Sequence, residues 1–367
     1  MAWSQISGIG PVLIRRLAQY FDSLESAWAA SSQDLQGVEG LGGQLVARIA
    51  DQRSQINPAQ LLEEHSRENP HFWTPADAEY PRLLLETPTA PPVLYYRGKV
   101  NLLENEGVIP AIALVGTRDP TPYGKKWTQR LATRLANKGF LIVSGMAAGI
   151  DTEAHRACLE AGKRTIAVLG TGIDIAYPPR NQGLYRNIVQ HGLVVSEYPQ
   201  GTPPDRSHFP QRNRIIAGLC RAVLVMEAPS KSGALITAYI ANEYNRDVYV
   251  LPGSLDSEKS LGCLSLVSKG AQLILGEDHL LEMLGELPNL DLLSSSQQEL
   301  LPAVNSALAQ LPPNLSKVLQ VIPVEAIGFD AIVQTLQTSA AEVAGALLQL
   351  ELMGLISQLP GMRYQRN

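Results

Sequence analysis

Residues 111–118 read Ala-Ile-Ala-Leu-Val-Gly-Thr-Arg, a short apolar run that ends in a glycine and then a cation. Residues 140–151 repeat this form, because Phe-Leu-Ile-Val leads into Ser-Gly-Met-Ala-Ala-Gly-Ile-Asp. Continuously apolar runs, as opposed to alternating ones, are typical of parallel strands that crossover helices bury on both faces. The pattern predicts an α/β class protein with a Rossmann-like, doubly wound, mostly parallel sheet. Segments of helical pattern separate the remaining apolar runs, which lie at 165–169, 193–195, 222–226, 248–251 and 272–275.

The chain divides into four parts on this pattern. Residues 1–70 predict a helical domain of helix-hairpin-helix or SAM-like form, and residues 71–285 predict the core domain, with its sheet from about residue 111. Within these parts, prolines at 58–92 indicate an irregular connection with short helices near 61–67 and 81–85. A polar stretch at 286–312 is typical of a linker, and a small domain is predicted at 313–367.

The last part predicts a winged-helix-like domain. Helical segments at 315–321, 330–337 and 340–353 precede a hairpin that turns at Pro360-Gly361. Ser339, with Glu342 three residues later, has the pattern of a capping box at the third helix. The third helix normally reads a DNA groove, but 340–353 contains no lysine or arginine. A protein-contact or structural role is therefore favoured for this domain.

The first part contains an internal repeat at residues 6–17 and 38–49. Each copy is a Gly-x-Gly turn that enters an amphipathic helix, which resembles the helix-hairpin-helix motif. Such turns can bring backbone amides close to a DNA phosphate. The alternative is a helical interaction module whose turns simply need glycine, and the second copy has only Arg48 and Arg53 nearby to hold a phosphate. Both interpretations stay open.

Charge and composition limit the classes of partner and the cellular location that are expected. The net charge of −5 argues against a nucleic-acid partner, but two segments are locally basic. Residues 115–139 carry six basic residues against one acidic, and residues 205–231 carry five against two. The chain starts without a signal-peptide pattern and has no apolar run long enough for a membrane span, so a cytoplasmic protein without membrane contact is expected. The three cysteines lie far apart, which predicts small core residues and no metal site.

The residues that follow each strand form the candidate site, because the carboxyl ends of parallel strands meet at one edge of a sheet. Glycines there permit close backbone approach, and a helix starting near Ala147 offers unpaired amides and a positive dipole end to a phosphate. Arg118, Arg212 and Arg214 supply forked, charged donors. Phe209, between a polar loop and a basic helix start, is a candidate platform on which an unpaired base stacks.

Two phrases are more specific than any single glycine turn. Ser-Gly-x-Ala-x-Gly-Ile-Asp at 144–151, followed by Phe-Pro-x-Arg-Asn-Arg-Ile-Ile-Ala-Gly at 209–218, resembles the DNA processing protein A (DprA/Smf) family. Glu227-Ala, then Ser-Gly-Ala-Leu-Ile-Thr-Ala at 232–238 and Val-Leu-Pro-Gly at 250–253, extends the resemblance over the sheet domain. The helical head and winged-helix-like tail are similar to accessory domains that many members carry.

The resemblance implies a non-enzymatic protein that binds single-stranded DNA without sequence preference. Members protect the strand and help to load the recombinase RecA during natural transformation. Single-stranded DNA, RecA, single-strand binding protein and a second copy bound through the sheet domain are the implied partners, with no cofactor. The DNA contacts implied by the matched phrases are Gly116, Thr117, Arg118, Ser144, Gly145, Gly149, Phe209, Arg212 and Arg214, followed by the less closely matched Arg206 and Lys231.

This chain departs from the family pattern at two positions. Members often carry arginine where this chain has Ala148, which removes a phosphate contact and predicts lower affinity. Leu264 stands where an asparagine is usual, which puts the geometry of that loop in question.

The competing interpretation is a nucleotide-binding enzyme of the phosphoribohydrolase (lysine-decarboxylase-like) type. Such enzymes need a Pro-Gly-Gly-x-Gly-Thr-x-x-Glu phrase, whose glutamate carries the acid-base chemistry. The corresponding region, 228–237, contains no glutamate. The next one along the chain is Glu243, which does not have the required spacing. His155 and His208 are interpreted as isolated from any acidic or thiol partner that would make a nucleophile–base pair, so solvent-facing or capping roles are expected for them.

Overall fold

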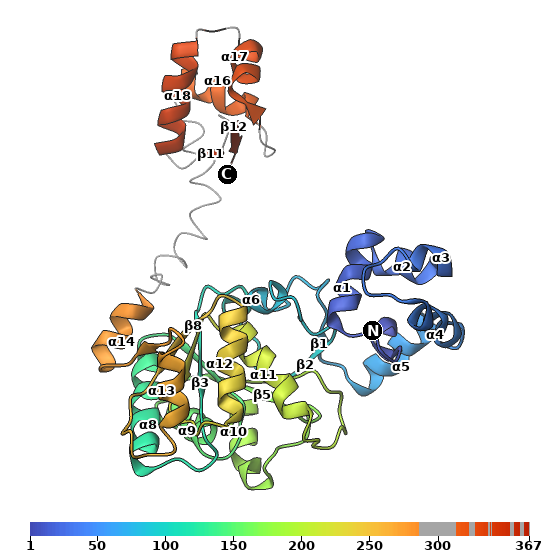
Figure 1. Cartoon of the computed structure of the whole chain (residues 1–367). Helices are drawn as coiled ribbons and strands as arrows, with labels where there is room; N and C mark the ends of the chain where they lie inside the picture. The colour runs from blue at the N-terminus through green and yellow to red at the C-terminus, as the bar shows by residue number, and fades with distance from the viewer. Residues whose placement is uncertain are drawn as a thin grey trace. The chain divides into compact units, whose positions relative to one another are not determined.

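The computed structural model describes residues 1–285, 313–322, 327–336, 338, 340–352, 356–359 and 363–366. The chain forms two compact units, Met1–Leu287 and Pro288–Asn367 (Figure 1). Within the described residues, no helix has both the length and the apolar character needed to cross a bilayer. The predicted linker at 286–312 lies outside the described residues.

A nine-stranded, mostly parallel sheet forms the centre of the first unit. Its strands lie in the order β1-β2-β6-β5-β4-β3-β7-β8-β9, and neighbours from β6 to β9 in that order run parallel. The predicted α/β class and doubly wound sheet are confirmed. The strands are β1 (Phe72–Trp73), β2 (Leu94–Gly98), β3 (Ala111–Val115), β4 (Leu141–Ser144), β5 (Thr165–Leu169), β6 (Leu193–Ser196), β7 (Ala222–Val225), β8 (Asp247–Val250) and β9 (Gln272–Leu273).

Both faces of the sheet are buried, as the continuously apolar runs predict. Ala113 and Val115 of β3 belong to one buried cluster, whereas Ile112 and Leu114 belong to another. Helices α11 and α12 contribute to the first cluster, and α8, α9 and α14 contribute to the second. The helices around the sheet are α6 (Arg82–Leu85), α7 (Leu102–Asn105), α8 (Pro122–Asn137), α9 (Ile150–Glu160), the short 3-10 helix η2 (Pro179–Asn181), α10 (Gln182–His191), α11 (His208–Leu219), α12 (Gly233–Glu243), α13 (Leu261–Val267) and α14 (Glu277–Leu284).

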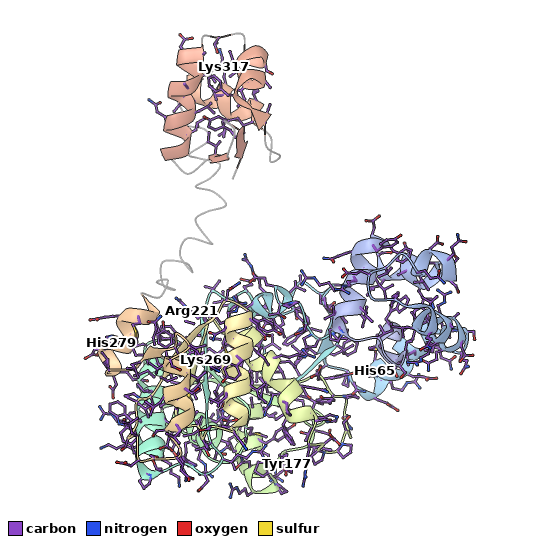
Figure 2. The ribbon with its side chains drawn as sticks, viewed as in Figure 1. His65, Tyr177, Arg221, Lys269, His279 and Lys317 are labelled. Atoms are coloured by element: carbon purple, nitrogen blue, oxygen red, sulfur yellow. The ribbon has the colours of Figure 1, made fainter. Side chains whose placement is uncertain are left out.

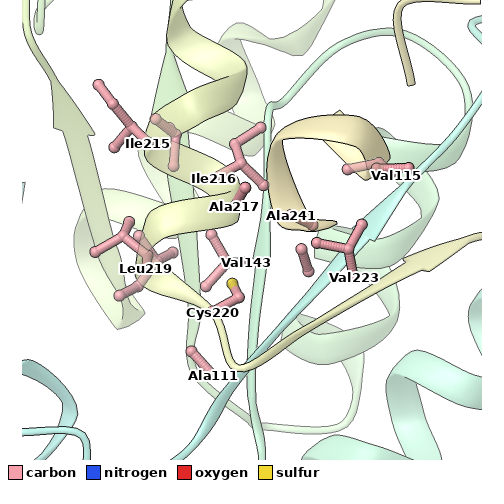
Figure 3. Packing of buried hydrophobic residues seen from close by; sticks show 14 of the residues in the cluster. Ala111, Val115, Val143, Ile215, Ile216, Ala217, Leu219, Cys220, Val223 and Ala241 are labelled. Carbon is pink, nitrogen blue, oxygen red and sulfur yellow. The ribbon is translucent and has the colours of Figure 1, made fainter. Parts of the chain in front are cut away.

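The first cluster packs small and branched side chains closely. Figure 3 shows Val143 and Val223 of the sheet together with Ile216 of α11 and Ala241 of α12. Cys220 lies in the same cluster and is fully buried, and the other two cysteines are also buried with free thiols. The prediction that the cysteines are core residues is confirmed.

The strand order creates a switch point between β3 and β7. From β3 the chain winds outward through β4, β5 and β6, and then returns to place β7 on the other side of β3. At such a point the loops leave the strands in opposite directions and open a crevice at the carboxyl edge. Figure 2 labels one residue at each end of the parallel strands: Arg221, just before β7, lies at the amino end, and Tyr177, in the loop after β5, lies at the carboxyl end.

The segment at 58–92 is more regular than predicted. It contains α5 (Pro58–Glu68) and α6 as expected, but β1 also falls within it and β2 follows directly. Both strands run antiparallel, β2 against β6 and β1 against β2. Placing the start of the sheet near residue 111 was therefore wrong. The reason is physical, since the two-residue edge strand β1 and the short strand β2 after the prolines are defined by their pairing partners and not by local pattern.

The N-terminal residues form a helical module within the first unit. Its two predicted turns contain Gly8 and Gly40, with φ angles of +92° and +91° that glycine adopts without strain. Arg15 joins the module to the segment before β2, because its guanidinium donates to the Thr87 carbonyl at 3.2 Å. The helices of this module are η1 (Ala2–Gln5), α1 (Pro11–Tyr20), α2 (Leu24–Ala29), α3 (Ser32–Leu35), α4 (Gly43–Ser54) and α5. A domain boundary at residue 70 stays a prediction.

The two copies of the repeat exchange contacts. Arg48 of the second copy donates to the Ser7 carbonyl in the first turn at 3.2 Å, and Arg16 of the first copy donates to the Glu39 carbonyl in the second turn at 3.0 Å. Arg53 donates to the carbonyls of residues 28 and 30. The cations that sequence alone offers to a phosphate near the second turn, Arg48 and Arg53, are therefore engaged in holding the module together.

The second unit has the predicted winged-helix-like order. Its elements are α16 (Pro313–Val321), β10 (Ile327–Gly328), α17 (Phe329–Leu336), α18 (Ala340–Leu352), β11 (Ile356–Leu359) and β12 (Arg363–Arg366), and the strands form a small sheet in the order β10-β12-β11. Leu319, Ile332 and Leu347, one from each helix, are buried in its core. The predicted cap residue Ser339 and the turn at Pro360-Gly361 lie outside the described residues.

Candidate nucleic-acid interface

A pocket of about 690 Å³ opens at the carboxyl edge of the sheet, at the β3/β7 switch point. The loops after β3, β4, β5, β6 and β7 all contribute to its lining. Convergence of these loops at one edge was the expectation from sequence. The polar and aromatic residues that line the pocket are Thr117, Arg118, Asp151, Tyr177, Arg206, Phe209, Arg212, Asn213, Lys231, Ser232 and Thr237.

Arg118 and Phe209 lie together in this pocket. The guanidinium carbon of the exposed Arg118 is 5.5 Å from the centroid of the Phe209 ring, within the range of a cation–π contact. Tyr177 lies beside the same ring, with centroids 5.2 Å apart and planes inclined by 34°. Sequence reasoning missed Tyr177 as a site residue, although an aromatic side chain in the loop after β5 was a usable signal.

A glycine after β5 makes room for the aromatic platform. A Cβ atom placed on Gly170 would lie 2.9 Å from the ring of Phe209, so a larger residue at that position would displace the ring. Phe209 is half-buried, which fixes the ring against the loop while part of its surface faces outward. This is the arrangement expected of an aromatic side chain that stacks on a ligand, and a fully buried core residue would have no such face.

Arg212 lies beneath the pocket as a buried cation. Only 4% of its surface is exposed, and Nη1 donates to the carbonyl of Gly145 at 2.6 Å and to that of Val168. Burial lowers the pKa of its guanidinium to about 10, which leaves it protonated near neutral pH. Arg212 therefore joins the loop after β4 to β5 and places a fixed positive charge under the pocket. It is not the exposed, forked donor that sequence alone suggests.

Asp151 is the buried counterpart of Arg212. One of its carboxylate oxygens accepts from the amides of Gly145 at 3.1 Å and Ala147 at 3.3 Å. Burial raises the pKa of this carboxyl, while the charge of Arg212 and the two amides oppose the shift. Helix α9 begins at Ile150, whose amide donates to the Thr117 carbonyl. Of the amides near Ala147 that the sequence offers to a phosphate, these three are therefore used within the protein.

Three predicted contacts of the β4 loop build the site without lining the pocket. Ser144 is fully buried and donates its hydroxyl to the Leu114 carbonyl at 2.6 Å. Gly145 is buried against Arg212, since a Cβ there would lie 2.3 Å from Nη1. Gly149 has a φ of +81°, and a Cβ would lie 2.4 Å from the Thr117 carbonyl oxygen. Close packing of this loop is what requires the Ser-Gly and Gly-Ile phrases.

Arg214 faces away from the pocket. Its guanidinium donates to the Thr89 carbonyl at 2.7 Å and forms an ion pair with the half-buried Glu197. Residues two apart on a helix point about 200° from each other, so Arg212 and Arg214 cannot serve one face of α11. The prediction that Arg214 belongs to the binding edge is corrected by this placement.

The cations of the pocket lack the ion-pair partners that Arg130 and Arg134 of α8 have within the described residues. Arg118, Arg206 and Lys231 form no ion pair within the described residues. In contrast, Arg130 and Arg134 of the basic segment 115–139 pair with Glu277 and Asp278 at the start of α14, at 2.7 and 3.0 Å. Unpaired cations around a concave surface create a local positive potential even in an acidic protein.

Acidic and basic groups that could carry out catalysis are tied up in the fold. Among the described residues lining the pocket, Asp151 is the one carboxylate, and it holds amides. Glu227 is buried and accepts from the amide and hydroxyl of Thr121 at 2.8 and 2.5 Å. His155, expected to face solvent, is instead fully buried, and burial lowers its pKa to about 3. The expectation for His155 was wrong because the small residues around it in α9 do not reveal from sequence how closely that helix packs on the sheet.

The fold and the pocket together define a Rossmann-like protein with a cationic, partly aromatic ligand pocket and appended helical and winged-helix domains. Residues 71–285 match the family described as DNA recombination-mediator protein A, and residues 302–362 match the DprA winged helix domain. Protein Smf from Synechocystis is 49% identical over all of this chain and 98% of its own length. The chain belongs to the DprA/Smf family of DNA-processing proteins, as its sequence motifs predicted.

Solved structures of family members support the same assignment. DNA processing protein A from Streptococcus pneumoniae is 38% identical and superposes with a TM-score of 0.65 over 75% of this chain and 93% of its own. DNA processing protein A from Helicobacter pylori is 33% identical, with a TM-score of 0.52 over 58% of this chain and 95% of its own. The latter structure is described as showing a unique single-stranded DNA binding mode of that protein.

Proposed function

We propose that this protein binds single-stranded DNA without sequence preference in the switch-point pocket. The observation that carries the proposal is the juxtaposition of the exposed Arg118 with the Phe209 ring in a pocket that also holds unpaired cations. Aromatic faces stack on any base, and arginine and lysine side chains bind phosphates of any sequence. The single-stranded DNA binding described for the Helicobacter pylori relative supports single-stranded DNA as the ligand proposed for this chain.

Six of the residues that line the pocket are proposed to contact DNA directly. Arg118, Arg206 and Lys231 would bind phosphates, Phe209 would stack on a base, and Gly116 and Thr117 would allow close approach of the strand. Ser144, Gly145, Gly149 and Arg212 support these contacts from below or beside the pocket, whereas Arg214 faces away from it. A nucleotide-cleaving enzyme is not favoured, since no carboxylate of the pocket lining is placed for acid-base work.

The partners and location are proposed on the family relationship. We infer that the protein acts in the cytoplasm as a recombination mediator that protects incoming strands and helps to load RecA. Single-strand binding protein is a further proposed partner, and a homodimer through the sheet domain is the proposed assembly. A strand-exchange assay with RecA and single-strand binding protein tests the loading step directly.

Single-stranded DNA is expected to bind more tightly than duplex DNA of the same length. The aromatic pair of Phe209 and Tyr177 needs an exposed base face, which stacking inside a duplex removes. Fluorescence anisotropy with labelled strands, at matched ionic strength, measures the two affinities. Equal or tighter binding of the duplex would contradict base stacking in this pocket.

Replacing Arg118 by alanine is expected to weaken binding equally for strands of different sequence. Loss of one phosphate contact lowers the slope of log affinity against log salt by about 0.7 for a single strand. Titrations at several salt concentrations, with two strands of unrelated sequence, measure the affinity and its salt slope. Lys163→Ala provides the control, because Lys163 is an exposed cation before β5, at the opposite edge of the sheet. An unchanged slope in the Arg118 variant would remove Arg118 from the interface.

A further inference from the structure

A second hollow adjoins the pocket and shares Arg118 with it. This hollow has a volume of about 380 Å³ and lies between the start of α8, the first turns of α9 and η2. Its basic lining residues are Arg118, Lys125, Arg156 and Arg180. Arg118 therefore stands at the junction of two cavities, and its long side chain can serve a ligand in either.

The acidic side chains of this hollow already have partners. Asp119 pairs with Lys259 at 2.7 Å, with its side chain largely exposed. Glu153 accepts from the amide of Gln129 at 2.8 Å and lies 3.9 Å from Arg156. Both carboxylates are thus offset by groups of the protein.

Three cations of the hollow remain without such a partner. Within the described residues, Arg118, Lys125 and Arg180 form no ion pair. Elsewhere on this acidic chain exposed arginines such as Arg67 and Arg82 pair with a glutamate four residues away. The concentration of unpaired cations along one hollow favours an anionic ligand there.

The walls of the hollow are held in place before any ligand binds. The side-chain amide of the buried Asn181 donates to the Met146 carbonyl at 2.9 Å and to the Thr152 hydroxyl at 2.8 Å. Thr121 caps the start of α8 by accepting from the Gly124 amide at 3.1 Å. A preformed site loses less conformational entropy when it binds a flexible chain.

The lining of the hollow differs in kind from that of the pocket. No aromatic residue lines the hollow among the described residues, whereas Phe209 and Tyr177 line the pocket. Cations without aromatic faces suit the sugar-phosphate backbone and leave the bases unread. The two cavities are therefore complementary parts of a path for one polymer, which a mononucleotide site would not need.

We propose that a strand bound at Phe209 continues past Arg118 into this hollow, where Lys125 and Arg180 bind its next phosphates. The inference rests on the proposed function, because it extends the same single-stranded ligand. It assigns the direction in which the strand leaves the pocket, toward the first turn of α8 and η2. It also predicts that the contribution of the hollow depends on strand length.

The test compares short and long strands on a double variant. Lys125→Ala/Arg180→Ala is titrated with labelled oligothymidine of about 4 and about 16 nucleotides, the span of known single-strand site sizes. For the long strand, loss of two phosphate contacts lowers the salt slope by about 1.4, and for the short strand the slope stays at the wild-type value. Thermal unfolding confirms that the variant keeps its fold.

The control variant removes the same charge elsewhere. Lys138→Ala/Lys163→Ala deletes two exposed lysines that precede β4 and β5, at the other edge of the sheet, and that form no ion pair in the part of the chain the structure describes. The proposed path is contradicted if the hollow variant has the same salt slope as this control at both strand lengths while Arg118→Ala weakens binding. In that case the proposal that the pocket binds DNA is retained. An equal loss with short and long strands also overturns the path. Absence of wild-type binding to either strand overturns both the path and the proposed function.

Discussion

Replacing Arg212 by alanine is expected to lower the free energy of unfolding by about 3–5 kcal/mol, the usual cost of removing one partner from a buried charge cluster. The substitution leaves the carbonyls of Gly145 and Val168 without their donor and the buried Asp151 without a neighbouring cation. Urea denaturation followed by circular dichroism measures the change. Because the loop after β4 loses its tie to β5, loss of DNA binding by this variant would reflect loss of structure.

Arg206→Ala is the matched control for Arg212. Arg206 lines the same pocket but is exposed and forms no ion pair within the described residues. Surface substitutions of this kind change stability by roughly 0.5 kcal/mol or less. The two arginines should therefore separate stability from binding, with Arg212 affecting both and Arg206 affecting binding alone. An Arg212 variant that unfolds at the wild-type urea midpoint would refute its proposed role as a buried tie.

Replacing Phe209 by alanine is expected to weaken single-strand binding roughly fivefold to 150-fold, which corresponds to the 1–3 kcal/mol of one stacked base. The ring is the platform between Arg118 and Tyr177, so its loss also removes the surface that orders both side chains. Anisotropy titration at fixed salt measures the change. The salt slope should stay near the wild-type value, because no phosphate contact is deleted.

Two companion variants sharpen this result. Phe209→Trp keeps an aromatic face and should retain most of the affinity. Tyr123→Ala removes a half-exposed aromatic side chain of α8 that lines neither the pocket nor the hollow, and should bind as the wild type does. A Phe209→Ala protein that binds as tightly as Phe209→Trp would show that the ring packs without stacking on DNA.

Local pattern was enough to predict the parallel core of the fold. The runs that became β3 to β8 are buried on both faces, and each run indicates this through its largely continuous apolar character. The antiparallel edge was missed because β1 is two residues long and β2 is stabilised by pairing with β6. Such pairing depends on residues about a hundred positions away and leaves no local sign.

The sequence motifs predicted that candidate site residues gather at the carboxyl ends of the strands, but not how each side chain is oriented. Motifs place Arg118, Phe209 and Arg212 at one edge, and the structure brings all three to one pocket. Exposure could not be inferred, since Arg212 is buried and Arg214 pairs with Glu197 on another face. Helical phase alone would have shown that Arg212 and Arg214 diverge, but not which of the two faces the pocket.

The reciprocal contacts of Arg16 and Arg48 link the two halves of the N-terminal module. Deleting residues 1–31 would remove the donor of the Glu39 carbonyl and leave Arg48 with no Ser7 carbonyl to bind. Both halves also contribute to one buried cluster, so we expect shortened versions of this protein to fold only if they keep both halves or neither. The same dependence means that insertions between the halves are tolerated only where they leave the two turns facing each other's arginine.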